Sequence, residues 1–267
     1  MVNIKHDLIK ENSIEARLYQ EVLVARIIEK GNSLVVAPTA LGKTIVGVLL
    51  AAHRLKEKPT GKVLFLAPTK PLVVQHEKSF KKFLNIDEKK IISITGTTKP
   101  LDREEIYKTK TIINATPQTI ENDLLNGRIS LKDFELVIFD EAHRAVGEYA
   151  YVFVNLQLQK HNKNCLVVAL TASPGSEEEK IQDVCRNLSI NNIEVKNAED
   201  EDVKPYVNEI EIDWVKVELP PKFKQIKTYL EEFQKKLLIH FQNFLFSLLW
   251  LKELYVFLLQ TQTFQVL

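Results

Sequence analysis

An α/β fold, with a mostly parallel sheet covered by helices on both faces, is predicted by three features of the sequence. Short β-branched runs alternate with longer helical stretches through the first 200 residues. Several of these runs are continuously apolar, as in strands that are buried on both faces. Short polar or glycine-containing runs follow several strands, and α/β sheets bind their ligands at the carboxyl ends of the strands. The functional site is therefore expected at that edge of the sheet.

The elements of this sheet can be placed one by one along the chain. Continuous apolar runs mark the strands, and apolar residues spaced three or four apart mark the helices. The strands expected are 34–37, 63–67, 91–95, 111–115, 135–140, 166–171 and 193–197. The helices expected include 15–29, 43–56, 71–83, 117–126 and 176–187.

The composition changes near residue 199, where an acidic run at 199–202 is typical of a solvated linker. A strand-like segment at 212–219 and two prolines come next, and an amphipathic helix follows them. One face of that helix carries Phe223, Ile226, Tyr229, Leu230, Phe233 and Leu237. We therefore predict a first domain over 1–200, and over 201–267 a linker and the start of a second structural unit.

The segment 237–267 is rich in apolar residues, and Lys252 and Glu253 are its only acidic or basic ones besides His240. It is long enough for a membrane anchor, but a charge at mid-helix costs about 2.5–3.5 kcal/mol on insertion scales. A helix of an insert domain without its packing partners and a non-native tail are the other interpretations. No membrane association is expected.

The overall composition is that of an ordinary globular protein, with 45% apolar and 27% charged residues. A net charge of +1 gives no global signature of nucleic-acid binding, so any basic surface must be local. Cys165 and Cys185 have neither metal-ligand spacing nor the density of a disulfide framework. The residues 1–12 have no apolar core, so no secretion signal is expected and a cytoplasmic location is predicted.

A phosphate-binding loop is predicted at 37–44, Ala-Pro-Thr-Ala-Leu-Gly-Lys-Thr, between the first apolar strand and a helical pattern. Backbone N–H groups and a helix N-terminus then point at a polyphosphate. Lys43 supplies a charge to the β- and γ-phosphates, and the Thr44 hydroxyl can ligate Mg²⁺. Thr39 and Gly42 complete the nucleotide-binding loop. Alanine stands at 37, where such loops usually have glycine, so this position must adopt an ordinary backbone conformation.

The run Asp140-Glu141-Ala142-His143 ends another apolar strand. A carboxylate at Asp140 can hold the same metal ion as Thr44. Glu141 is placed to polarise the attacking water. With Lys43 these two residues form the predicted catalytic set, and both motifs in this order indicate hydrolysis of ATP with Mg²⁺.

One further run precedes the first strand, and four others end the second, third, fourth and sixth strands. The whole series resembles the first motor domain of superfamily 2 helicases of the DEAH type. The resemblance covers about residues 14–200, and its spelling is most similar to the archaeal Hef and Fanconi anaemia group M helicase-translocases. It implies a RecA-like P-loop fold. The runs that carry it are Arg-Leu-Tyr-Gln at 17–20, Ala-Pro-Thr-Lys-Pro-Leu at 67–72, Thr-Gly at 95–96, Ala-Thr-Pro-Gln-Thr at 115–119 and Leu-Thr-Ala-Ser-Pro-Gly at 170–175.

The resemblance also implies residue roles. Arg17 and Gln20 would recognise the adenine. His143, Thr171 and Ser173 would couple hydrolysis to domain movement, with His143 also counted in the nucleotide site. Sequence-independent contacts with the nucleic-acid backbone would come from Thr69, Lys70, Thr95, Gly96, Thr116 and Gln118.

The function that the resemblance implies is an ATP-dependent DNA helicase or translocase acting on forked or branched DNA, in its ATP-binding half. The arginine motif of a second motor domain, Gln-x-x-Gly-Arg-x-x-Arg, is not found after residue 200. The resemblance therefore implies that 201–267 holds a linker and the truncated start of a helical insert or of this second motor domain, and that a second motor domain in trans is a possible partner. An RNA helicase of the same superfamily, and a nucleotide-binding module that is silent without a second motor domain, are the alternatives.

Overall fold

The computed structural model describes residues 2–38, 41–172, 178–206, 218 and 220–262, the last 21 of these by their backbone alone. Thr39 and Ser173, two of the predicted site residues, lie outside the described residues, and so does nearly all of the strand-like segment 212–219. The chain divides into two units, 1–208 and 209–267, each of which is described by itself. The domain boundary near residue 200 stays a prediction.

The first unit is built on a seven-stranded sheet in the order β3-β4-β2-β5-β6-β1-β7, and every paired strand is parallel. All seven predicted strands are confirmed. Their bounds are β1 Ser33–Val36, β2 Lys62–Leu66, β3 Ile91–Ile94, β4 Ile112–Ala115, β5 Phe134–Asp140, β6 Leu166–Thr171 and β7 Asn192–Val195.

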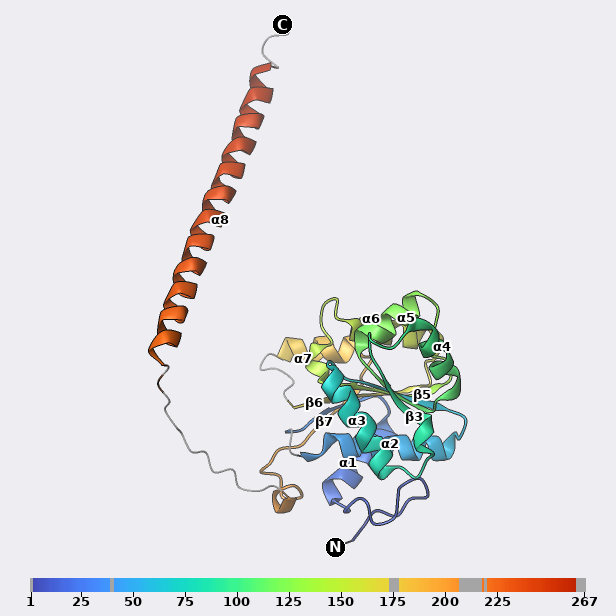
Figure 1. Cartoon of the computed structure of the whole chain (residues 1–267). Coiled ribbons are helices and arrows are strands. Elements are labelled where there is room, and N and C mark those ends of the chain that lie inside the picture. The colour runs from blue at the N-terminus through green and yellow to red at the C-terminus, as the bar shows by residue number, and fades with distance from the viewer. Residues whose placement is uncertain (1, 39–40, 173–177, 207–217, 219, 263–267) are drawn as a thin grey trace. The chain divides into compact units, whose positions relative to one another are not determined.

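Two layers of helices cover the sheet, as predicted. Alternate strand residues point to opposite faces, so Phe65 and Ile138 enter the core under α1–α3, while Leu64 and Phe139 enter the core under α4–α7. Figure 1 shows α1–α3 and α4–α6 on opposite sides of the strands. The bounds are α1 Leu18–Lys30, α2 Lys43–Glu57, α3 Lys70–Phe83, α4 Pro100–Thr109, α5 Pro117–Leu125, α6 Ala150–His161 and α7 Glu178–Asn187.

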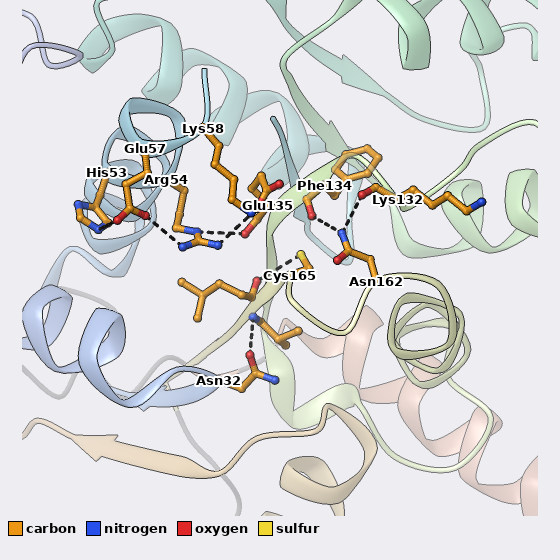
Figure 2. A network of polar contacts seen from close by, with 12 residues as sticks. Asn32, His53, Arg54, Glu57, Lys58, Lys132, Phe134, Glu135, Asn162 and Cys165 are labelled. Atoms are coloured by element: carbon orange, nitrogen blue, oxygen red, sulfur yellow. Dashed lines mark hydrogen bonds and ion pairs between the residues drawn. The ribbon is translucent and has the colours of Figure 1, made fainter. Parts of the chain in front are cut away.

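The amino-terminal edge of the sheet is closed by structural polar contacts (Figure 2). Glu135 in β5 accepts hydrogen bonds from Lys58 Nζ at 2.7 Å and Arg54 Nη2 at 3.4 Å, both at the end of α2. Asn32 Oδ1 accepts the backbone N–H of Val167 at 2.9 Å. Cys165 is buried beside them, and burial raises the pKa of its thiol to about 12, so this cysteine is an unreactive core residue.

The segment after β7 is more folded than a solvated linker. Lys196 Nζ pairs with Asp202 at 2.5 Å, and Val203 is fully buried in the core. A short turn, η4 (Lys204–Tyr206), brings the ring of Tyr206 to 5.7 Å from that of Tyr19 in α1. The acidic run therefore belongs in part to the packed first unit.

The second unit contains the predicted amphipathic helix, α8 (Pro221–Gln262). Its apolar face, from Phe223 to Leu237, is exposed. Among the helices that the structure describes, none combines the length and the hydropathy that a membrane span requires.

Candidate nucleotide and nucleic-acid site

The predicted phosphate loop joins β1 to α2 at the carboxyl edge of the sheet. Gly42 precedes the helix in the left-handed conformation, with φ 66° and ψ 41°. No side chain caps the first turn of α2. The N–H of Ile45 donates to the carbonyl oxygen of Gly42 at 2.8 Å, and the N–H groups that begin a helix without such a partner can bind an anion.

Lys43, the first residue of α2, is only 9% exposed and turns back across the loop. Its Nζ donates to the carbonyl oxygen of Ala37 at 2.7 Å. Burial lowers the pKa of Lys43, and the negative charges of Asp140 and Glu141 partly offset this by raising it. The structure thus places the lysine in the field of Asp140 and Glu141, which favours its charged form, and its contact with phosphate stays a prediction.

Asp140 is the last residue of β5 and is held from two sides. His76 Nε2, from α3, lies 2.9 Å from its Oδ2. The Tyr151 hydroxyl, from α6, donates to the backbone carbonyl oxygen of Asp140 at 2.7 Å and to that of Leu66 at 3.2 Å. Neither His76 nor Tyr151 was predicted as a site residue.

Glu141 follows with φ 50° and ψ 49°, the left-handed region that few side chains other than glycine adopt. Strain of this kind is typical of functional sites. Nδ1 of His143 lies 3.4 Å from Glu141 Oε2 and 3.2 Å from Thr171 Oγ1. His143 therefore connects the acidic motif to the end of β6, and its coupling role stays a prediction.

Arg17 and Gln20, the predicted adenine-binding pair, are engaged within the protein. Gln20 is 2% exposed, and its Nε2 donates to the carbonyl oxygen of Leu41 at 3.3 Å. The Tyr19 hydroxyl donates to the same carbonyl at 2.9 Å. The Arg17 guanidinium lies over the Tyr206 ring, 5.3 Å from its centroid. Helix α1 is thus hydrogen-bonded to the phosphate loop through the carbonyl of Leu41. Adenine recognition by Arg17 and Gln20 stays a prediction.

The predicted nucleic-acid contacts lie in three neighbouring loops, because β3, β4 and β2 are adjacent in the sheet. The residues in these loops differ in access: Thr69, Lys70, Gly96 and Gln118 are exposed, whereas Thr95 is buried and Thr116 is half-buried. The two less accessible hydroxyls face other threonines, with Thr95 Oγ1 at 2.9 Å from Thr97 Oγ1 and Thr116 Oγ1 at 2.8 Å from Thr119 Oγ1.

One sheet edge therefore carries two sets of loops. The loops after β1, β5 and β6 hold the phosphate loop, the acidic pair and Thr171, and β5 lies directly beside β2. Within the described residues, no cluster of three or more His, Cys, Asp or Glu side chains could hold a metal ion unaided. A metal ion here would need oxygens from a bound nucleotide besides those of Thr44 and Asp140.

Comparison with known proteins agrees with this geometry. The family model described as DEAD/DEAH box helicase matches residues 17–181. The crystal structure of the Pyrococcus furiosus Hef helicase domain is similar, with a TM-score of 0.74 and 49% identity over 85% of this chain and 47% of that chain. The predicted RecA-like fold and the predicted similarity to Hef are confirmed.

Two curated relatives show the range of names in the family. A Methanocaldococcus jannaschii protein named as an ATP-dependent RNA helicase is 45% identical over 87% of this chain and 29% of its own length. The Fanconi anemia group M protein homolog of Mus musculus is 36% identical over 75% of this chain and 10% of its own length. The chain thus spans less than a third of these curated relatives. It belongs to the DEAD/DEAH box helicase family.

Proposed function

We propose that this chain is the ATP-binding motor half of a DNA helicase or translocase that acts on forked or branched DNA. The observation that carries the proposal is the division of one sheet edge into a nucleotide half and a half with exposed hydroxyl, amide and ammonium groups. Two ligands that bind neighbouring loops of one sheet can change each other's affinity if both favour the same arrangement of those loops, and a motor requires such coupling.

In the nucleotide half, the phosphates of ATP would lie at the N-terminus of α2. Lys43 Nζ would exchange the Ala37 carbonyl for β- and γ-phosphate oxygens. Thr44 and Asp140 offer a hydroxyl and a carboxylate, the hard oxygen ligands that Mg²⁺ prefers, so the donor set fits this ion. Bound Mg²⁺ would neutralise charge on the phosphates, while Glu141 would orient the attacking water.

In the other half, Thr69, Lys70, Gly96 and Gln118 are exposed at the loops after β2, β3 and β4. These residues offer a hydroxyl, an ammonium group, an amide and a glycine backbone, all of which suit contacts with phosphate and sugar. Such contacts fix the position of the protein on the nucleic acid without recognising the base sequence. DNA binding by this chain would therefore be sequence-independent. A second motor domain in trans would supply the opposite side of the groove.

The test of the nucleotide site is calorimetric binding of ATP with Mg²⁺ to Lys43→Ala. Loss of a charge-assisted contact with phosphate should weaken binding at least tenfold while the melting temperature stays close to that of the unchanged chain. Lys58→Ala is the matched control, because Lys58 ends the same helix but pairs with Glu135 at the opposite sheet edge. Equal affinities of all three proteins would refute the assignment.

RNA is the second candidate partner, since one relative at 45% identity is named as an RNA helicase. Competition of forked DNA, duplex DNA and duplex RNA for a labelled fork, at one salt concentration, separates the two. Contacts with the phosphate backbone alone do not distinguish RNA from DNA. A preference for RNA over both DNAs would therefore require recognition of the 2′-hydroxyl and would favour the RNA helicase.

A further inference from the structure

His76 lies in the middle of α3, outside every motif that the sequence indicates. It is 4% exposed, and its ring packs on Phe65 of β2 with centroids 4.2 Å apart. Its Nε2 lies 2.9 Å from Asp140 Oδ2. A buried imidazole is ordinarily a core residue, but this one contacts the carboxylate that the nucleotide site uses.

The hydrogen-bond environment indicates which ring nitrogen carries the proton. Nδ1 of His76 is buried and, among the residues that the structure describes, has no hydrogen-bond partner. A proton on Nδ1 would leave a buried donor unsatisfied, which costs about 1–3 kcal/mol. A proton on Nε2 instead donates to Asp140 Oδ2 and leaves only a lone pair against the core. A proton on Nε2 is therefore favoured.

This donor restricts the orientation of the carboxylate. The terminal torsion of an aspartate is broad and roughly two-fold, so the side chain alone does not fix its plane. The Tyr151 hydroxyl holds the backbone carbonyl of Asp140, and His76 holds Oδ2. Together they hold both the backbone and the side chain of Asp140, and, as far as the described residues go, Oδ1 is the oxygen left for another ligand.

We infer that His76 is a positioning residue, whose Nε2–H holds the Asp140 carboxylate in the orientation that receives Mg²⁺ with ATP. The inference rests on the proposed function of the nucleotide site. Hydrogen-bonding partners of metal-ligating carboxylates commonly contribute 10- to 100-fold to metal affinity. His76 does not touch the nucleotide in this account and acts only through Asp140.

Three substitutions separate positioning from packing. His76→Phe keeps an aromatic ring against Phe65 and removes the donor. His76→Gln restores an N–H donor at about the distance of Nε2. Phe80→Leu is the matched control, because Phe80 is fully buried on the same helix and packs on the same Phe65 ring at 5.6 Å.

The readout is the gain in ATP affinity that Mg²⁺ gives, measured as Kd in EDTA divided by Kd in saturating Mg²⁺. His76→Phe should lower this gain about 10- to 100-fold and leave the Kd in EDTA within about twofold. His76→Gln should recover most of the gain. Phe80→Leu should lower the melting temperature but keep the full gain.

Equal gains in the unchanged chain and His76→Phe would overturn the inference and leave His76 as a packing residue. Absence of any Mg²⁺-dependent gain in the unchanged chain would instead refute the proposed function, and the inference with it. If His76→Phe does not fold, ¹⁵N-histidine NMR of the unchanged chain decides the matter without substitution. A proton on Nε2 of His76, with its signal shifting on addition of Mg²⁺ and ATP, supports the inference; a proton on Nδ1 overturns it.

Discussion

Gly42 is a residue whose replacement would test the geometry of the phosphate loop. Its φ is +66°, and a Cβ atom there would lie 2.8 Å from Nε2 of Gln20, which donates to Leu41. Two penalties therefore act on Gly42→Ala: left-handed backbone strain of about 1–2 kcal/mol, and displacement of Gln20 from the loop. We expect Gly42→Ala to lower the free energy of unfolding by more than the backbone term alone.

Two other glycines separate these penalties in urea denaturation. Gly127 has the same φ of +66° with nothing near its Cβ position, so Gly127→Ala measures the backbone term. Gly96→Ala has neither penalty and should stay within about 0.5 kcal/mol of the unchanged chain. If Gly42→Ala costs no more than Gly127→Ala, Gln20 is not packed against the loop as described.

The roles of single residues were predictable from the sequence only where a motif names them. Lys43, Asp140 and Glu141 stand in runs whose neighbours limit their chemistry. His76 lies 64 positions before its partner Asp140 and belongs to none of the motifs. Its contact with Asp140 therefore depends on how α3 packs on β2. Gln20 was predicted from its run, but its contact with Leu41 could not be, because that contact needs the position of α1 beside the loop.

At the scale of elements, α4 and α5 are joined through one buried carboxylate. Asp123 in α5 is fully buried and accepts hydrogen bonds from Arg103 Nε at 2.6 Å, Arg103 Nη2 at 2.8 Å and Tyr107 Oη at 2.6 Å. Arg103 Nη1 also donates to the carbonyl oxygen of Thr98, in the loop after β3. The cluster therefore supports the loops after β3 and β4, where nucleic-acid contacts are proposed.

Asp123→Asn should destabilise the chain by about 3–5 kcal/mol, because it leaves the charge of Arg103 buried without its partner. Asp183→Asn is the control, since Asp183 forms an exposed pair with Arg186 on α7 that is worth about 0–1 kcal/mol. Urea denaturation of both variants at neutral pH measures the difference. A loss under 1 kcal/mol for Asp123→Asn would contradict this account of the cluster.

The same carboxylate predicts a dependence on pH. Burial acts to raise the pKa of Asp123, but hydrogen bonds from Arg103 and Tyr107 outweigh it, so the pKa lies below 3.8. A carboxylate whose pKa is lower in the folded state stabilises that state at pH values above its unfolded pKa. This stabilisation is lost as the pH falls through the folded pKa. The stability difference between the unchanged chain and Asp123→Asn should therefore be constant above about pH 5 and shrink below about pH 4.

The central strands were predictable because they contain continuous apolar runs, such as 136–139 in β5 and 166–170 in β6, as strands buried on both faces do. Two helices were not predicted, and each has a physical reason. The buried residues of α4 are Arg103 and Tyr107, so the helix has polar groups where an apolar stripe would be expected. In α6, exposed Leu156 adds an apolar side chain away from the buried Val154 and Leu158, which obscures the amphipathic pattern.

At the scale of the whole molecule, the strand order decides which motifs are neighbours. The sequence places every motif except the run at 17–20 near the end of a strand, but it does not order the strands in the sheet. The order β3-β4-β2-β5-β6-β1-β7 groups the loops after β3, β4 and β2 and separates them from those after β6 and β1. Strand order depends on contacts between residues far apart in the sequence, so local patterns do not specify it.

The whole chain also predicts a limit on catalysis. Phosphoryl transfer in related nucleotide hydrolases uses an arginine that meets the charge developing on the γ-phosphate, worth about 10³–10⁵ in rate or roughly 4–7 kcal/mol. This sequence has no arginine after Arg186. The Arg186 side chain is 74% exposed and pairs with Asp183 at 3.2 Å. Arg144 is exposed in the turn η3 (Ala142–Arg144), directly after the acidic motif.

We therefore expect a polypeptide of these 267 residues to bind ATP with Mg²⁺, to hydrolyse it at or near the background rate, and to unwind no DNA. Phosphate release measured with and without forked DNA tests this, and Lys43→Ala purified in parallel excludes contaminating hydrolases. Adding a second motor domain in trans should raise the rate only if its arginine reaches the loop between β1 and α2. Strong DNA-stimulated hydrolysis by the chain alone, absent in Lys43→Ala, would mean that the missing positive charge comes from the chain itself or from a second copy of it.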